Sequence, residues 1–108
     1  MLTNKVKGEN FMSVLVLLEA KVKSEDISNI KSYMAEILPD TRAYDGCKSI
    51  DIYSNTEDNG SWVLVEHWES RSHHDKYIAW RKETGVIDKI GAMLDGPPST
   101  RYFEIIDL

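Results

Sequence analysis

The sequence predicts an α+β fold, a ferredoxin-like βαββαβ plait in which a four-stranded antiparallel sheet carries its helices on one face. Four segments have the alternating or continuous apolar pattern of strands, and two others repeat apolar residues every three or four positions. Their order is strand, helix, strand, strand, helix, strand, which is the split βαβ arrangement. The length of 108 residues suits one domain with one modest core.

The start of the chain differs in character from the rest. Residues 1–10 are polar and lack periodicity, which predicts a flexible N-terminal extension before a domain over residues 11–108. The apolar run over residues 11–18 is too short to span a bilayer, and Glu19 and Lys21 follow it without a cleavage pattern. We therefore assign this run to a core strand, and expect no membrane segment.

The first strand is expected over residues 12–22 and is apolar on both faces, with Val14 and Val16 on one side and Leu15 and Leu17 on the other. A helix should follow, because Ser24 can cap it and Glu25 and Asp26 suit its positive end. Its apolar positions step by three and four: Ile27, Ile30, Met34, Ile37 and Leu38. Pro39 is expected to end this helix.

A hairpin forms the next predicted unit. Gly46 opens the second strand, and Asn59-Gly60 predicts a tight turn, since both residues tolerate positive φ. The third strand is expected over residues 61–68. Alternation along it places Trp62, Leu64, Glu66 and Trp68 on one face, and Val63, Val65 and His67 on the other.

The last elements follow in order. Ser70 or Ser72 can cap a second helix, which Gly85 closes or bends. A short helix is predicted over residues 86–94 and a final strand over residues 100–107. That strand alternates Tyr102, Glu104 and Ile106 against Arg101, Phe103 and Ile105.

The sheet is expected to be covered on both faces. In a ferredoxin-like plait the helices cover one face only, yet the first and third strands are apolar on both sides. Leaving several large apolar side chains in water would cost several kcal/mol at roughly 25 cal/mol per Å². We therefore predict a homodimer formed by packing sheet against sheet.

Charge and cysteine content exclude other classes. The net charge of −5 offers no basic surface for nucleic acid or anionic lipid, so neither partner is expected. Cys47 is the one cysteine and cannot form an internal disulfide, which favours the cytoplasm. No His-x-x-x-His occurs and Cys47 has no spaced partner, so we predict no metal site.

Three segments of the sequence, residues 41–47 (TRAYDGC), 65–71 (VEHWESR) and 77–81 (YIAWR), together resemble a known family. This is the antibiotic biosynthesis monooxygenase family, and its quinol monooxygenase members in particular. The resemblance implies a dimeric α+β barrel with a pocket between sheet and helices in each protomer. It also implies oxidation of electron-rich aromatics such as hydroquinones by O₂ without a cofactor. Haem-degrading relatives carry an Asn on the first strand and a His late in the second helical segment, and this sequence has neither.

Such chemistry needs deprotonation of the substrate, a dry aromatic slot and hydrogen bonds to the resulting anion. The candidate catalytic residues are Trp68, which the resemblance carries over, Glu66 on the same strand face, and His74 near the start of the second helix. The candidate substrate-binding residues are Trp62, Tyr77, Trp80 and Arg81. His67, on the opposite strand face, is assigned to the dimer interface.

Simpler interpretations stay open for these residues. Both tryptophans can be core residues with Glu66 paired to a neighbour, and His73 and His74 can both be solvated. At the level of the whole protein, the alternatives to catalysis are a module that binds a small aromatic without turnover, and a purely structural dimer. A pocket of roughly 300 Å³ or more between sheet and helices would favour a ligand.

Overall fold

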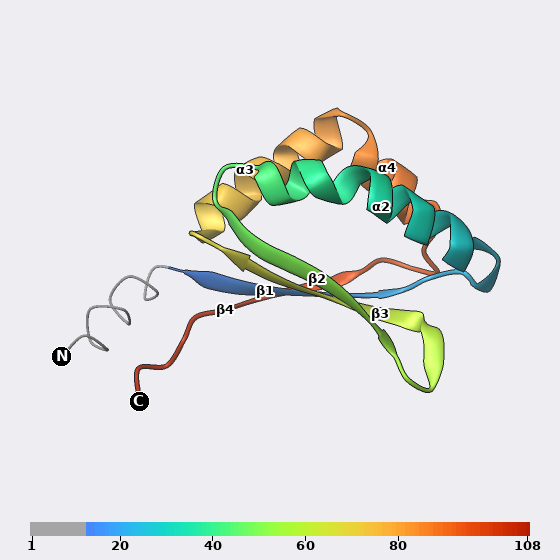
Figure 1. Cartoon of the computed structure of the whole chain (residues 1–108), viewed down its shortest axis with the longest axis horizontal. Helices are drawn as coiled ribbons and strands as arrows, with labels where there is room; N and C mark the ends of the chain where they lie inside the picture. The colour runs from blue at the N-terminus through green and yellow to red at the C-terminus, as the bar shows by residue number, and fades with distance from the viewer. Residues whose placement is uncertain (1–12) are drawn as a thin grey trace.

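A computed structural model describes residues 13–108, so the predicted extension over residues 1–10 lies outside the described residues. Three helices lie on one side of a four-stranded antiparallel sheet whose strand order is β2-β3-β1-β4 (Figure 1). The elements are β1 (Val14–Lys21), η1 (Ser24–Asp26), α2 (Ile27–Ala43), β2 (Cys47–Asn55), β3 (Asp58–Trp68), α3 (Arg71–Glu83), α4 (Val86–Gly91) and β4 (Ser99–Phe103). This arrangement confirms the predicted ferredoxin-like plait.

The register of the sheet determines which side chains face the helices. Along β1 and β3 the pairs Val14 with Trp68, Val16 with Glu66, Leu18 with Leu64 and Ala20 with Trp62 lie opposite one another. Trp62, Leu64, Glu66 and Trp68 are all buried, whereas His67 is exposed. The predicted division of this strand into two faces is therefore confirmed.

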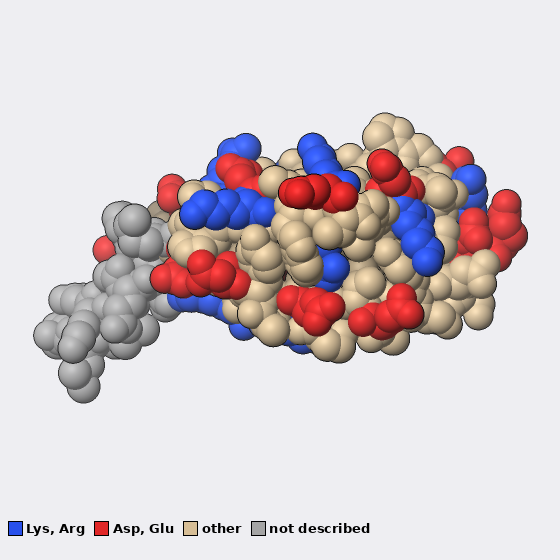
Figure 2. Space-filling model, turned by 90° about the horizontal axis from the view of Figure 1, so that it is seen from above, with Lys and Arg blue, Asp and Glu red and all other residues tan. Residues whose placement is uncertain are grey.

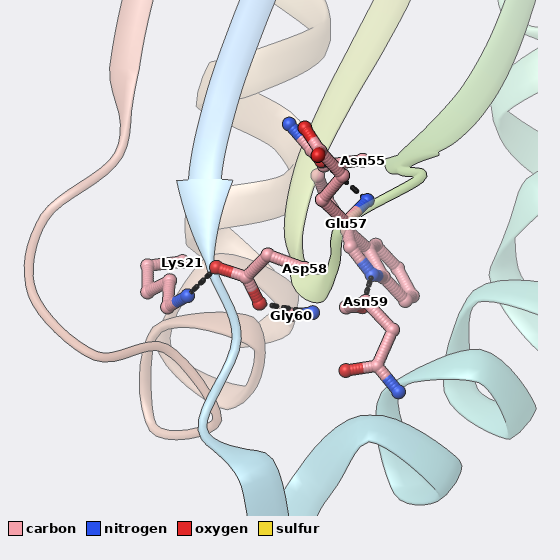
Figure 3. A network of polar contacts seen from close by, with 7 residues as sticks. Lys21, Asn55, Glu57, Asp58, Asn59 and Gly60 are labelled. Atoms are coloured by element: carbon pink, nitrogen blue, oxygen red, sulfur yellow. Dashed lines mark hydrogen bonds and ion pairs between the residues drawn. The ribbon is translucent and has the colours of Figure 1, made fainter.

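The hairpin between β2 and β3 is confirmed, but its turn is not at Asn59-Gly60. The strands are joined by residues 56–57, and Asn59 and Gly60 lie inside β3. Asn55 Oδ1 accepts a hydrogen bond from the Glu57 amide at 2.7 Å, and Asp58 Oδ1 accepts one from the Gly60 amide at 3.1 Å (Figure 3). Side-chain oxygens thus stabilise the turn, and no residue of it has positive φ.

Gly60 allows the backbones of β3 and of Val22 to lie close together. A Cβ there would stand 3.0 Å from the Val22 carbonyl oxygen, and the Gly60 carbonyl accepts a hydrogen bond from the Val22 amide at 2.7 Å. Next to it, Asp58 forms an ion pair with Lys21 across the sheet (Figure 3). Asp58 thus links the start of β3 to the end of β1.

The prediction that Pro39 ends the first long helix is wrong, because α2 continues to Ala43. Proline removes one amide donor from the helix, so the turn after it needs support from elsewhere. Thr41 Oγ1 and the Arg81 guanidinium both donate to the Ile37 carbonyl, at 3.4 and 2.9 Å. The contact with α3 thus holds the last turn of α2 in place.

The core consists of two groups of buried side chains under the helices. The first, the Trp62 cluster, comprises Val22, Ile30, Met34, Ile37, Trp62, Val86 and Leu94. The second, the Trp68 cluster, comprises Val14, Val16, Trp68 and Tyr77. The two clusters occupy opposite ends of the same sheet face, since Leu64 and Glu66 lie between Trp62 and Trp68 along β3.

The other face of the sheet carries no helix (Figure 1). Leu15, Leu17, Val63 and Val65 are half-buried there, and Phe103 is 39% exposed. β4 ends at Phe103 rather than at the predicted residue 107. The helix side is different in character: seen from above, acidic and basic side chains are interspersed over the helices (Figure 2).

Candidate functional site

A buried carboxyl group lies at the end of β3, next to a tryptophan. Glu66 and Trp68 alternate onto the helix side of the strand, where they are 3% and 0% exposed. The Trp68 indole N–H donates to Glu66 Oε1 at 2.9 Å. This hydrogen bond fixes the carboxyl group within the sheet–helix layer and leaves its other oxygen available.

The capping of α3 brings an imidazole to this carboxyl group. Ser70 is the N-cap, and its Oγ accepts a hydrogen bond from the His73 amide at 3.2 Å. From this start His74 faces the sheet and is 2% exposed, with Nε2 3.8 Å from Glu66 Oε1. That separation exceeds a hydrogen bond, and Nε2 is buried without a partner among the described residues. His73 instead contacts Ser70 Oγ.

Burial changes the acidity of both groups. It raises the pKa of Glu66 from 4.5 to about 7, an effect that the Trp68 hydrogen bond partly opposes. Burial also lowers the pKa of His74, with Asp75 acting against this and Arg71 adding to it. Near neutral pH, Glu66 is therefore close to half ionised and His74 is mainly uncharged. Such a pair can accept a proton from a phenolic hydroxyl group.

Aromatic rings surround this pair. Trp68 lies 5.3 Å from the His74 ring and 5.0 Å from Tyr77 between ring centroids. Tyr44, which follows α2, packs on Tyr77 at 5.3 Å, and the Tyr102 hydroxyl is 2.9 Å from His74 Nδ1. Neither Tyr44 nor Tyr102 is among the site residues predicted from the sequence. Alternation along the last strand placed Tyr102 on one of its faces, but only the pairing of β4 with β1 brings it to His74.

Tyr77 and Arg81 point their polar groups at α2. The Tyr77 hydroxyl lies 2.6 Å from Thr41 Oγ1 and accepts a hydrogen bond from Arg81 Nε at 3.0 Å. Arg81 is 4% exposed and also donates to Thr41 Oγ1 and to the Ile37 carbonyl, each at 2.9 Å. Trp80 stacks on Tyr44 at the edge of the Trp68 cluster. The ring of Tyr77 thus packs against Trp68, which holds Glu66, whereas the Arg81 guanidinium is hydrogen-bonded to α2.

Trp62 lines a separate apolar cavity between the sheet and the helices. The cavity measures about 140 Å³. Its walls come from β1, α2, β3, α4 and the segments that follow β1 and α4: Leu18, Ala20, Val22, Ile30, Met34, Trp62, Leu64, Ile87, Ile90, Gly91, Leu94 and Pro98. This volume is below the roughly 300 Å³ that would favour a ligand, although an apolar cavity of about 150 Å³ can accommodate a benzene-sized ring. Leu64, one of its walls, is two residues from Glu66 on the same strand face, but neither Glu66 nor His74 lines the cavity.

A larger hollow of about 540 Å³ lies on the helix-free face. Leu15, His67, Phe103 and Ile105 are among its walls, and neither Glu66 nor His74 reaches it. We place the candidate chemistry at Glu66 and His74, because the larger hollow holds no comparable buried acid and base.

Two further findings concern metals and membranes. Among residues 13–108, no three His, Cys, Asp or Glu side chains come together in a way that could hold a metal ion. Within the same range, no helix has the length and apolar character needed to cross a bilayer.

Comparison with known proteins identifies relatives over most of the chain. The family model described as "Antibiotic biosynthesis monooxygenase" matches residues 13–84. A Mycobacterium tuberculosis protein, named "Putative monooxygenase Rv0793", is 26% identical over 94 residues, which are 87% of this chain and 92% of that protein.

Solved structures share the fold. The crystal structure of a conserved protein from Methanosarcina mazei has a TM-score of 0.82 at 15% identity, covering 90% of this chain and 96% of that one. The structure of Rv0793 has a TM-score of 0.77 at 24% identity, covering 89% and 97%. SnoaB from Streptomyces nogalater, described as a cofactor-independent oxygenase, has a TM-score of 0.77 at 11% identity, covering 90% and 96%.

Proposed function

The chain belongs to the antibiotic biosynthesis monooxygenase family, and from this premise we propose that it oxidises a quinol-like or other electron-rich aromatic molecule with O₂ and without a bound cofactor. The observation that carries the proposal is the buried pair of Glu66 and His74 beside Trp68, on the sheet face that also bears an apolar cavity of about 140 Å³. The names of its relatives, a monooxygenase and a cofactor-independent oxygenase, support the same class of reaction.

The reaction balances without an external reductant. Removal of a hydroxyl proton converts a hydroquinone into an anion that transfers one electron to O₂. The two resulting radicals combine at a ring carbon, and loss of one water from the hydroperoxide leaves the hydroxylated quinone. One hydroquinone and one O₂ thus give one hydroxyquinone and one water. The protein must accept the first proton, stabilise the anion and exclude bulk water.

The described residues suit these three tasks. Glu66 accepts the proton, since a carboxyl group with a pKa of about 7 is balanced between its two forms at neutral pH, and His74 lies beside it to stabilise the anion. Trp68 holds the carboxyl group by its indole N–H. The rings of Trp68 and Tyr77 exclude bulk water from the site. The cavity volume favours a single ring over a polycyclic substrate.

Oxygen uptake tests the proposal. Purified protein is incubated with a panel of single-ring hydroquinones, and uptake is compared with autoxidation in buffer. We expect enzyme-dependent uptake that falls by about 100-fold in Glu66→Gln, because loss of a general base typically has this effect. A similar factor is expected in His74→Ala, because a donor that stabilises the anion is lost. Glu69→Gln, which removes an exposed carboxylate from the end of the same strand, serves as the matched control. Rates equal to autoxidation for every quinol would refute catalysis.

A specific observation favours one alternative, binding without turnover. The cavity walls are wholly apolar, so a small aromatic molecule can be held there without using Glu66. Quenching of Trp62 fluorescence by a hydroquinone, with uptake at the autoxidation rate, would support this alternative.

We also propose that two copies pack through their helix-free faces. Exposed apolar side chains on and beyond β4, Phe103 at 39% and Ile105 at 57%, together with Val65 on β3, support this interface. Sedimentation should show a dimer at micromolar concentration and a monomer for Val65→Glu. The lone cysteine, Cys47, is suited to a reducing compartment, so we propose a cytoplasmic location.

A further inference from the structure

We propose that Tyr102 is a positioning residue that fixes the tautomer of His74, so that Nε2 carries the imidazole proton and faces Glu66. Glu66 is then the proton acceptor of the site, and His74 is its N–H donor. The assignment of these two roles rests on the proposed function, whereas the tautomer itself does not.

The sheet register brings the three residues together across one strand. Val16 on β1 pairs with Glu66 on β3 and with Tyr102 on β4, so Glu66, Val16 and Tyr102 form one row on the helix face. The His74 imidazole lies over this row. Its Nδ1 is 2.9 Å from the Tyr102 hydroxyl, and its Nε2 is 3.8 Å from Glu66 Oε1. The ring therefore bridges the row, with one nitrogen toward each side chain.

The chemistry of the two groups decides the direction of the hydrogen bond. A phenol O–H is a stronger donor than a neutral imidazole N–H, and an imidazole nitrogen is a stronger acceptor than a phenol oxygen. Burial raises the pKa of Tyr102, so its hydroxyl keeps the proton that it donates. When Nδ1 accepts from Tyr102, the single proton of neutral His74 must reside on Nε2.

The surroundings keep this arrangement in place. The Arg71 guanidinium lies 3.9 Å from the centroid of the Tyr102 ring, and the ring itself packs against His74 at 5.5 Å. The Tyr102 hydroxyl is the one hydrogen-bond partner of this imidazole within residues 13–108, since Nε2 has none. Loss of the hydroxyl would therefore leave the tautomer undetermined while the aromatic packing persists.

The consequence is a division of labour between acid and base. Glu66 accepts the hydroxyl proton of the substrate, and the Nε2–H group donates a hydrogen bond to the oxygen anion that forms. A neutral imidazole that donates from a fixed nitrogen stabilises a developing negative charge without requiring a protonated histidine.

The test is the long-range ¹H–¹⁵N spectrum of the imidazoles in the full chain without substrate, recorded above the pH at which His74 titrates. The His74 signals are assigned by their loss in His74→Ala. We expect the chemical shift of a protonated nitrogen at Nε2 and that of an unprotonated nitrogen at Nδ1. In Tyr102→Phe both shifts should move toward intermediate values, because the two tautomers then exchange.

Tyr44→Phe is the matched control, since Tyr44 lies in the same aromatic group but its hydroxyl makes no hydrogen bond among the described residues. It should leave both His74 shifts unchanged. A wild-type spectrum with the proton on Nδ1 would overturn the proposal, and so would a Tyr102→Phe spectrum identical to wild type.

Turnover supplies a second, separate readout. If oxygen uptake is observed, Tyr102→Phe should lower kcat by at least about tenfold, with KM changed by less than about twofold, as expected for loss of a tautomer-fixing hydrogen bond. An unchanged kcat would overturn the division of roles. If no quinol is oxidised but the tautomer is as expected, the proposed function fails and the positioning role of Tyr102 stands.

Discussion

Replacing Glu66 by Gln should change the pH dependence of stability in a direction that the structure determines. Glu66 is 3% exposed, and burial raises its pKa from 4.5 to about 7. The folded protein therefore holds this proton more tightly than the unfolded chain does. Stability from this group is fully present below pH 4.5, decreases as the pH rises, and is lost once the pH exceeds about 7.

The magnitude follows from the difference between the two pKa values. A tenfold change in proton affinity corresponds to about 1.4 kcal/mol, so ionising Glu66 costs the folded state about 3 kcal/mol. Gln cannot ionise, and its side-chain oxygen can still accept the Trp68 N–H. We expect Glu66→Gln to gain about 2.5 kcal/mol relative to wild type between pH 5 and pH 8.5, because part of the difference is already lost at pH 5.

Urea unfolding at half-unit pH intervals, at one fixed protein concentration, measures this difference. The lowered pKa of His74 acts in the opposite direction, because it decreases stability as the pH falls below 6.5. This contribution is present in both proteins and should cancel in their difference. Glu69→Gln should follow the wild-type curve. Parallel curves for wild type and Glu66→Gln would refute the inference that Glu66 ionises at a cost within the core.

Three further predictions concern neighbouring contacts. Gly46→Ala should destabilise the protein more than Gly85→Ala in urea unfolding. Both glycines have positive φ (+89° and +84°), but only at Gly46 would a Cβ meet the His73 side chain, at 2.4 Å. The Gly85 change should cost about 1 kcal/mol, and equal losses of stability would contradict the proposed clash. Arg81→Met should lower the free energy of unfolding by about 2–3 kcal/mol and reduce hydrogen-exchange protection in the last turn of α2. A decrease in that free energy of less than about 0.5 kcal/mol would show that α2 does not need this support. Trp68→Phe should raise the pKa of Glu66 further in a carboxyl ¹³C titration, since it removes the hydrogen bond that lowers that pKa. A lower pKa of Glu66 in this variant would contradict the role given to the Trp68 hydrogen bond.

Two predictions made from local residue preferences, a turn at Asn59-Gly60 and a helix end at Pro39, are wrong for the same physical reason. Asn59-Gly60 has the composition of a hairpin turn. Gly60 is instead needed inside β3, because a Cβ at this position would lie 3.0 Å from the Val22 carbonyl oxygen. Pro39 has the properties of a helix end, yet Arg81, distant in sequence, supports the turn beyond it. In both cases a contact between remote segments outweighs the preference of the local residues.

The candidate site was predictable in part for the same reason. Alternation placed Glu66 and Trp68 on one strand face, and helical spacing placed His74 with Tyr77. These are relations within one element. Tyr44 and Tyr102 could not be identified, because their proximity to the site depends on the end of α2 and on the pairing of β4.

The order of elements, the two faces of the central strands and the residue types available for chemistry follow from the amino-acid sequence, because hydrophobic periodicity and charge are properties of short segments. Three other features depend on how the elements pack. Glu66, His74 and Tyr102 meet across Val16, Arg81 binds α2 and does not line the cavity, and the cavity beside Trp62 has the volume of a single ring. Strand register and helix packing determine distances between remote residues, and those distances set the hydrogen bonds and the acidity of the buried groups.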